Sequence, residues 1–187
     1  MSEPVSALNG LRSSGMVTLA EAGLKGMITL RGDLADPRLA AALNAELGCT
    51  VPARRRLAAG AGGSALWMSP DELLLITDHA RAGALVAALE SALAGGFFTL
   101  ADVSDARAVF TLEGAQARDV LAKICPVDFS DFEPGEVRRT RAAQVAAALW
   151  RASEDEFTLV CFRSVAQYMW DLLETVSRPG GEVGLYR

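Results

Sequence analysis

The segment from Asp102 to Asp128 constrains the fold more than any other part of the chain. It predicts a strand, a turn, a second strand and a short helix. The helical run opens after Gly114, and Pro126 ends it because proline cannot donate the next backbone hydrogen bond. The segment contains no histidine and no pairing of a nucleophile with a base, so it is typical of architecture rather than catalysis. Its strand-forming residues are Val103, Val109, Phe110 and Leu112.

Length and composition limit the class of protein. The 187 residues suit one domain, or two small halves that share a core. The net charge of −5 argues against a nucleic-acid partner, which needs a basic surface. No apolar run reaches about 18 residues, so we expect no membrane span. The first residues lack a basic segment followed by an apolar one, so we expect no secretory signal.

The cysteines favour a reduced compartment. Cys49, Cys125 and Cys161 are odd in number and widely spaced, which fits neither a disulfide framework nor a metal clip. Cys125 falls at the end of a predicted helix, where the dipole disfavours a thiolate. These features predict a cytoplasmic protein with reduced thiols.

The first half of the chain predicts a strand at Met27–Arg31 and then a helix. Asp36 can cap that helix, Pro37 suits its first position and Gly48 is its expected end. Residues 50–63 follow as a loop whose glycines do not match a phosphate-binding loop. The loop contains Arg54, Arg55 and Arg56. This arginine triplet is either a solvated turn or a contact for an anion or a partner.

A hairpin is predicted next, with strands at 65–68 and 73–77 joined by a turn at 69–72. The second strand is apolar on both faces, so we expect it to be central and covered by a helix. Thr77 or Asp78 is expected to cap that helix, and Gly95 to end it. His79, the only histidine, then lies in its first turn as an exposed residue. A catalytic or metal role would need partners that its neighbourhood lacks.

The second half repeats this plan. Residues 128–135 form an acidic loop without the spacing of a calcium site, and its two phenylalanines are expected to anchor it to the core. Residues 137–150 are ambiguous, but their later part predicts a hairpin with 157–162.

Ser164 and Gln167 form a capping box before the last helix. Trp170 lies off the apolar stripe of that helix, where it is either peripheral packing or a partner surface. The stripe consists of Val165, Tyr168, Met169, Leu172, Leu173 and Val176.

These elements predict an α+β fold of two similar halves, each with antiparallel strands and helices packed on the sheet. The expected halves are residues 27–96 and 97–176. Residues 1–26 are expected to form a flexible N-terminal arm, or an arm that becomes ordered on a partner. Residues 177–187 are expected to form a C-terminal tail.

Several short motifs in a fixed order carry a family resemblance over roughly residues 27–176. The chain resembles the gamma subunit of heterotetrameric sarcosine oxidase. The strand-turn-strand-glycine-helix block is also similar to the folate-binding domain of glycine-cleavage T protein relatives, which predicts the same folate-binding-domain-like fold. The motifs are Leu66-Trp67, Pro70-Asp71-Glu72, Asp102–Arg107, Gly114 with Ala117-Arg118, Leu121–Lys123, Cys125-Pro126 with Asp128, and Phe162–Asp171.

The resemblance implies a role within a larger enzyme. The family enzyme oxidises N-methylglycine to glycine, its alpha and beta subunits hold the NAD and flavins, and its delta subunit holds zinc. The gamma subunit is thought to carry no cofactor, and the residues offer no dinucleotide fingerprint. We therefore expect a non-catalytic subunit with no catalytic, cofactor or metal site, which could self-associate when isolated. The candidate partner contacts are Arg54, Arg55, Arg56, Trp170 and Tyr186.

A second hypothesis is a stand-alone folate-binding or aminomethyltransferase-like protein. It would need a buried carboxylate among aromatic side chains. Asp102 and Asp105 are the acids available, although turn hydrogen bonds explain them equally well. Arg107 and Arg118 are expected to be structural and to pair with a nearby acid: Asp102, Asp105 or Asp119.

Overall fold

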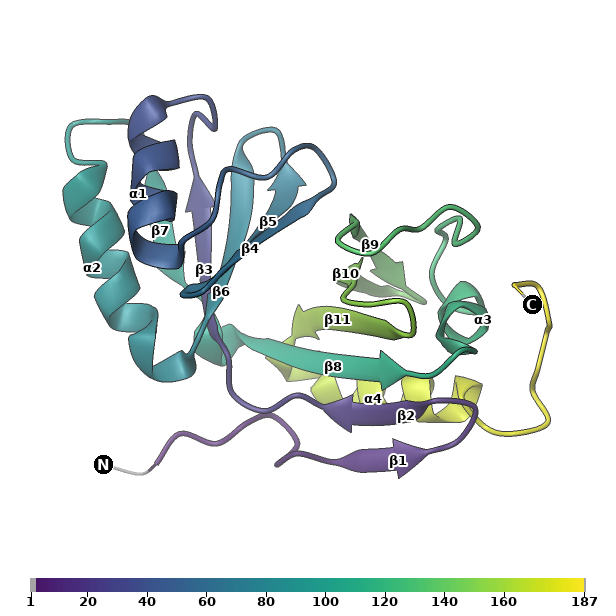
Figure 1. Ribbon diagram of the computed structural model, residues 1–187. Helices are drawn as coiled ribbons and strands as arrows, with labels where there is room; N and C mark the ends of the chain where they lie inside the picture. The colour runs from purple at the N-terminus through teal and green to yellow at the C-terminus, as the bar shows by residue number, and fades with distance from the viewer. Residues whose placement is uncertain (1–2, 187) are drawn as a thin grey trace. The chain divides into compact units, whose positions relative to one another are not determined.

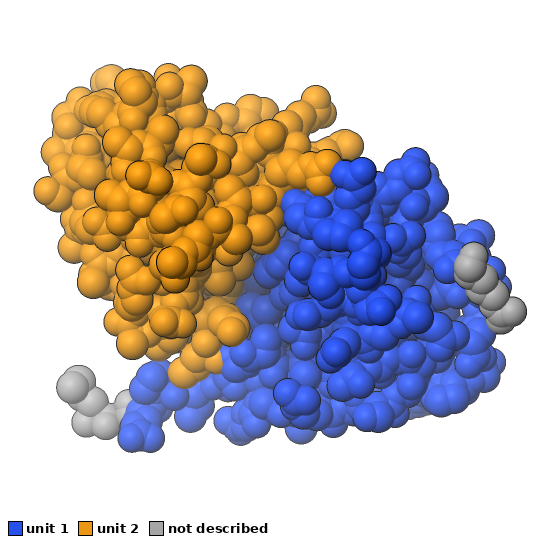
Figure 2. All heavy atoms as spheres, in the orientation of Figure 1, with its two compact units in different colours: residues 1–23, 106–187 blue, residues 24–105 orange. Residues whose placement is uncertain are grey.

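The computed structural model describes residues 3–186, so the outermost residues of the expected arm and tail lie outside the described part. The chain divides into two compact units (Figure 2). Unit 2 is residues 24–105, and unit 1 combines the residues before 24 with those after 105. In the described residues, no helix is both long and apolar enough to cross a bilayer.

Unit 2 is a five-stranded antiparallel sheet with two helices on one face (Figure 1). β6 is its middle strand, as its apolar sequence predicts. The helices are α1 (Pro37–Leu47) and α2 (Ala82–Ala92), and both bury leucines against the sheet. In sheet order the strands are β4 (Leu57–Gly60), β5 (Gly63–Ser69), β6 (Glu72–Thr77), β3 (Gly26–Arg31) and β7 (Thr99–Asp102).

The start and end of α1 are those that the sequence predicts. An Asp36 carboxylate oxygen accepts a hydrogen bond from the Arg38 N–H at 2.8 Å, and Pro37 occupies the first turn. Gly48 ends the helix at φ +71°, a left-handed conformation that glycine adopts without strain. The predicted loop at 50–63 was too long, because residues 57–60 pair with β5 as strand β4.

The predicted cap of α2 is wrong. The 3₁₀ turn η1 (His79–Arg81) precedes α2, and Asp78 at its start makes no capping side-chain bond among the described residues. The Thr77 hydroxyl donates instead to the Gly62 carbonyl at 2.8 Å. The extra turn separates both candidate caps from the first turn of α2.

Unit 1 is a six-stranded antiparallel sheet with α3 (Ala117–Ala122) and α4 (Ala166–Val176) packed into its core (Figure 1). The ambiguous stretch 137–150 forms two strands that turn at Ala143, whose φ is +49°. The predicted hairpin of β10 with β11 is confirmed. In sheet order the strands are β1 (Arg12–Ser14), β2 (Thr18–Glu21), β8 (Arg107–Glu113), β11 (Glu156–Phe162), β10 (Val145–Arg151) and β9 (Val137–Ala142).

The units do not match the expected halves 27–96 and 97–176. Strand β7 pairs with β3, with Ile28 opposite Asp102, so residues 99–102 complete the sheet of unit 2. Within the expected arm, residues 12–21 form β1 and β2, and β2 pairs with β8 of unit 1. Strands of three and four residues are too short to give a periodic signal, which is why the arm shows none in the sequence.

The N-terminal hairpin also closes the end of α4. The Met16 N–H donates to the Ser177 carbonyl at 2.7 Å, and Lys123 Nζ donates to the Val176 carbonyl at 2.7 Å. Both carbonyls lie at the helix C-terminus, where intrahelical donors run out. The residues before β1 are held as well, because the Glu21 carboxylate accepts hydrogen bonds from Ser6 and Gly10.

The start and the buried face of α4 differ from the prediction. The 3₁₀ turn η3 (Arg163–Val165) puts Val165 at the cap position, so Ser164 does not cap the helix. The Gln167 amide donates to Asp171 instead. The buried residues of α4 are Ala166, Met169, Trp170 and Leu173. This face is rotated from the predicted stripe, so Trp170 points into the core and Tyr168 is half-exposed.

Candidate functional site

The arginine triplet forms an exposed turn of unit 2 between α1 and β4. Arg55 lies at its tip with φ +60°, in the left-handed region. The backbone of Arg56 is fixed on both sides: its N–H donates to Ala53, and its carbonyl accepts from Trp67 at 3.1 Å. The turn therefore displays its guanidinium groups from an ordered backbone, which suits a contact with an acidic surface.

Trp170 lies in the core of unit 1. Its side chain is 5% exposed, and its ring centre lies 6.4 Å from that of Phe110 on β8. It is the largest side chain of α4 and fills the space between the helix and the sheet. Trp170 therefore belongs to the buried face of the helix. Trp170 consequently offers a partner almost no surface.

Tyr186 anchors the C-terminal tail to unit 1. Its N–H donates to Asp119 Oδ1 at 2.9 Å, and the Gly184 N–H donates to Asp119 Oδ2 at 3.0 Å. The Tyr186 hydroxyl accepts a hydrogen bond from the Phe129 N–H at 3.3 Å, and the two rings meet edge to face. Asp119 is buried in α3, and the two tail amides satisfy its carboxylate there.

The acidic loop at 128–135 is anchored by its aromatic residues, as predicted. Phe129 and Phe132 are buried, stack on each other with ring centres 5.6 Å apart and pack against Phe157. Asp128 accepts hydrogen bonds from the hydroxyl and the N–H of Ser130, which lower the pKa of that carboxyl. The loop thus has turn chemistry. In the part of the chain that the structure describes, no three metal-ligating side chains gather into a metal site.

All three thiols are buried and poorly suited to nucleophilic chemistry. Burial raises the pKa of Cys125 to about 12 and that of Cys161 to about 11, and it also raises the pKa of Cys49. A thiol reacts as the thiolate, so these groups stay unreactive near neutral pH.

The acids of the 102–105 turn serve the fold. Asp102 Oδ1 accepts hydrogen bonds from the N–H and the hydroxyl of Ser104, and the Ser104 oxygen accepts one from the Met27 N–H at 2.9 Å. This serine therefore holds β3 beside the turn. His79 Nε2 lies 3.4 Å from Asp105 Oδ1, the residue after this serine. Asp102 thus makes the turn hydrogen bonds that were one of the two explanations for it in the sequence.

The two family-like arginines contact an aromatic ring and a loop carbonyl within unit 1. The Arg107 guanidinium carbon lies 4.1 Å from the ring centre of Phe162, its direct partner across the β8–β11 pair. This is a cation–π contact. Arg118 donates to the Ser130 carbonyl at 3.4 Å. These contacts tie strand to strand and helix to loop within unit 1.

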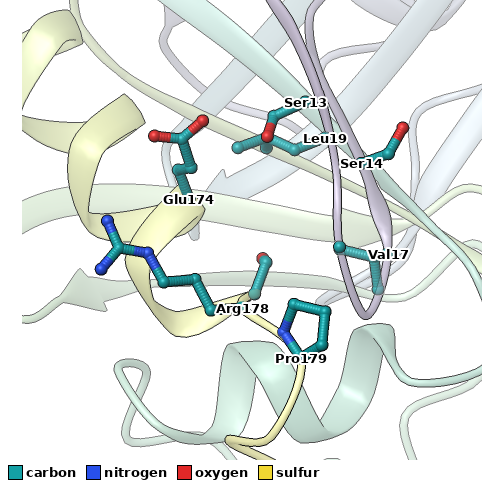
Figure 3. A pocket seen from close by; sticks show the side chains of 9 residues that line it. Ser13, Ser14, Val17, Leu19, Glu174, Arg178 and Pro179 are labelled. Carbon is teal, nitrogen blue, oxygen red and sulfur yellow. The ribbon is translucent and has the colours of Figure 1, made fainter.

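The described residues of unit 1 line small hollows, two of which are as follows. The first, about 50 Å³, lies between the β1–β2 hairpin and the end of α4. Figure 3 shows Glu174 and Arg178 on the helix side and Ser13, Val17 and Leu19 on the hairpin side. The second, about 140 Å³, is lined by polar side chains that include Arg118, Arg151 and Tyr186. Both are smaller than typical ligand pockets of roughly 300–1,000 Å³.

Comparison with known proteins then decides the family. Residues 31–178 match the model of the sarcosine oxidase, gamma subunit family. The chain belongs to this family. It is 36% identical over 124 residues to the sarcosine oxidase gamma subunit of Corynebacterium sp. strain U-96 and 37% identical over 123 residues to that of an Arthrobacter species. These alignments cover 64% and 63% of this chain but 60% and 59% of the relatives' own length.

Solved structures agree with the family assignment. The heterotetrameric sarcosine oxidase from Corynebacterium sp. U-96, solved in complex with pyrrole 2-carboxylate, contains a chain with a TM-score of 0.79 to this one. The two chains are 30% identical, and the match covers 89% of this chain and 87% of that one. The predicted resemblance to the sarcosine oxidase gamma subunit is therefore confirmed.

A more distant match supports the fold alone. The glycine cleavage system aminomethyltransferase T from Bartonella henselae has a TM-score of 0.59 and 18% identity, over 80% of this chain and 43% of that protein. The predicted α+β, folate-binding-domain-like fold is confirmed by this likeness and by the two helix-covered antiparallel sheets.

Two residues have roles in the structure that the sequence did not predict, since Asp119 was expected only as a partner for an arginine and Phe97 was given no role. Asp119 looks like an ordinary helix acid, because its tail partners lie more than 60 residues away. Phe97 looks like the start of a strand, yet its side chain is 100% exposed. Its position directly after Gly95-Gly96 was the one available signal that it lies at a loop tip.

Proposed function

We propose that this chain is the gamma subunit of a heterotetrameric sarcosine oxidase and contributes surface rather than chemistry to the complex. The family assignment over residues 31–178 carries the proposal. The match to a chain of a heterotetrameric enzyme over 89% of this chain supports assembly with other subunits. The partners in the proposal are the alpha, beta and delta subunits, which oxidatively demethylate sarcosine.

The side chains of the described units support a structural role. The thiols are buried with raised pKa values, and the hydroxyl of Ser104 is bonded between a turn carboxylate and a backbone amide. Aromatic residues fill the core around Phe129 instead of lining an open pocket. The role we assign is packing: the chain covers surface on the catalytic subunits and holds them in register. Permanent interfaces of this kind bury on the order of 2,000 Å² or more of surface.

Affinity purification tests the assembly. The tagged chain is co-expressed with the alpha, beta and delta subunits from the same bacterium and purified through its tag. We expect all four chains to elute together from size exclusion at constant stoichiometry in 0.5 M salt, on the order of a few times physiological ionic strength. Recovery of the tagged chain alone would contradict the proposal. The cytoplasmic location predicted from the sequence is part of the same proposal.

Titration with tetrahydrofolate tests the stand-alone alternative. A folate-binding protein would release or absorb heat in the calorimeter at micromolar protein concentration, whereas a packing subunit would give the heat of dilution alone. Binding by the isolated chain with no assembly would replace our proposal with the alternative.

A further inference from the structure

We infer that Phe97, on the loop between α2 and β7, is an anchor that inserts into an apolar pocket of another subunit of the heterotetramer. This inference rests on the proposed function. Phe97 is 100% exposed, while Phe98 beside it is packed against the core of unit 2. A large aromatic side chain that is fully solvated in the free chain is the kind of residue that dominates binding once a partner buries it.

The loop is held from the α2 side. α2 ends at Ala92, and the chain reverses through Gly95, whose φ of +78° suits glycine. The Arg38 Nη1 donates to the Ala94 carbonyl at 3.3 Å, and the Arg38 guanidinium is itself held by Asp36 through Nη2–Oδ2 at 2.7 Å. The N-cap of α1 therefore braces the end of α2.

The loop is also held from the β3 side. A Cβ placed on Gly32 would lie 2.3 Å from Cδ1 of Phe98, and one placed on Gly96 would lie 2.8 Å from that ring. The Phe98 ring thus fills the space between two glycines that cannot be enlarged. Its immediate neighbour Phe97 must point to the opposite side, because the chain continues directly into the extended strand β7.

A rigid presentation of this kind lowers the entropic penalty of binding, because neither the backbone nor the neighbouring side chains need to be ordered. Phe97 lies inside residues 31–178, the segment that defines the family, and the solved relative is a heterotetramer. Both observations favour another subunit of the enzyme over an unrelated partner. The pocket that fits it is apolar and accepts one phenyl ring.

The test compares wild-type chain, Phe97→Ser, Phe97→Leu and the control Tyr168→Ser in the same binding measurement. Tyr168 is a half-exposed aromatic residue on α4 of unit 1. Its replacement by serine therefore removes an aromatic surface residue, as Phe97→Ser does. Each full-length chain is titrated against the purified alpha–beta–delta particle by biolayer interferometry. We expect Phe97→Ser to weaken binding about tenfold or more, Phe97→Leu to weaken it less, and Tyr168→Ser to bind as wild type does. Thermal unfolding of the isolated chains should be unchanged by Phe97→Ser, since the side chain makes no core contact.

Each other outcome rejects the inference in a distinguishable way. If wild type binds and Phe97→Ser binds equally, the anchor is wrong and the proposed function stands. If wild type does not bind the particle, the proposed function fails and the anchor with it. If the isolated wild-type chain dimerises in sedimentation and Phe97→Ser does not, the occupant is a second copy of this chain and the inference is overturned.

Discussion

Asp119 on α3 holds the backbone of Tyr186, 67 residues later in the chain, through a hydrogen bond of 2.9 Å. The other carboxylate oxygen accepts from the Gly184 N–H, so one buried side chain binds two amides of the tail. The tail lies beyond residues 31–178, which match the family model. Its docking onto unit 1 is therefore a feature of this chain that the family assignment alone does not describe.

We expect Asp119→Asn to lower the free energy of unfolding by about 1–3 kcal/mol, because one amide N–H of the tail then faces an NH₂ group in a buried site. Urea denaturation measures the change, and hydrogen exchange should show faster exchange at Gly184 and Tyr186. The control is Asp131→Asn on the exposed surface, which should stay within about 0.5 kcal/mol of wild type. Equal stability of both variants would mean that the tail is not held by this carboxylate.

Arg107→Ala should destabilise unit 1 by about 1 kcal/mol through loss of the contact with Phe162. We expect a lower urea midpoint, and in the assembled enzyme an unchanged turnover per mole of complex. Arg107→Lys keeps the charge over the ring and should retain most of the stability. A variant that assembles normally but loses most of its turnover would assign Arg107 a chemical role and refute this account of it.

Two glycines give opposite predictions. A Cβ on Gly15 would lie 2.3 Å from the Ser177 carbonyl oxygen, so Gly15→Ala should push the β1–β2 hairpin from α4 and cost about 1–3 kcal/mol. Gly83 lies in α2 with no atom near the added methyl group, so Gly83→Ala should stabilise the chain by about 0.5–1 kcal/mol. Thermal unfolding measures both. If Gly15→Ala is neutral, the hairpin does not pack on the end of α4.

Stability should fall at alkaline pH through the buried thiols. The ordinary thiol pKa is near 9.0, and burial raises that of Cys125 to about 12. Below pH 9 the thiol is protonated in the folded and the unfolded chain, so it adds no pH dependence. Above pH 9 the unfolded chain ionises first, and the free energy of unfolding falls by up to about 1.4 kcal/mol per pH unit for this thiol until the folded pKa is reached.

Urea denaturation between pH 8 and pH 10.5 checks this slope, with Cys125→Ala as the comparison. The free energy of unfolding of the variant should fall less steeply with pH than that of wild type, because one thiol with a raised pKa has been removed. At pH 8, thiol reagents should label the cysteines of the native chain slowly. After unfolding, the same reagents should label all three cysteines. Identical slopes for the two chains would show that Cys125 is not buried as described.

Local signals predicted much of the fold. Asp36, Pro37 and Gly48 set the ends of α1 by backbone chemistry that needs no distant partner, and the Pro70-Asp71 turn set the β5–β6 hairpin. The fold class followed from the order of these elements. The predicted caps of α2 and α4 failed because each helix begins with a 3₁₀ turn, which the sequence pattern does not distinguish from the first turn of a helix.

The failures at larger scale come from long-range pairing. Strand β2 pairs with β8, about 90 residues away, and nothing in its own few residues encodes that partner. The rotation of α4 that buries Trp170 depends on the space beside Phe110. Of the candidate contacts, the arginine turn at 54–56 is exposed as expected, Trp170 is in the core, and Tyr186 is engaged by Asp119. The exposure of Phe97 depends on where Phe98 packs, which only the folded chain shows.

The most direct test of a packing role omits this chain from the enzyme. The alpha, beta and delta subunits are co-expressed with and without it, and sarcosine turnover per flavin and particle mass by native mass spectrometry are compared. We predict a four-chain particle with full turnover when this chain is present, and an alpha–beta–delta particle that has lost most of its turnover when it is absent. A stable three-chain particle that turns over sarcosine at the full rate would contradict the account.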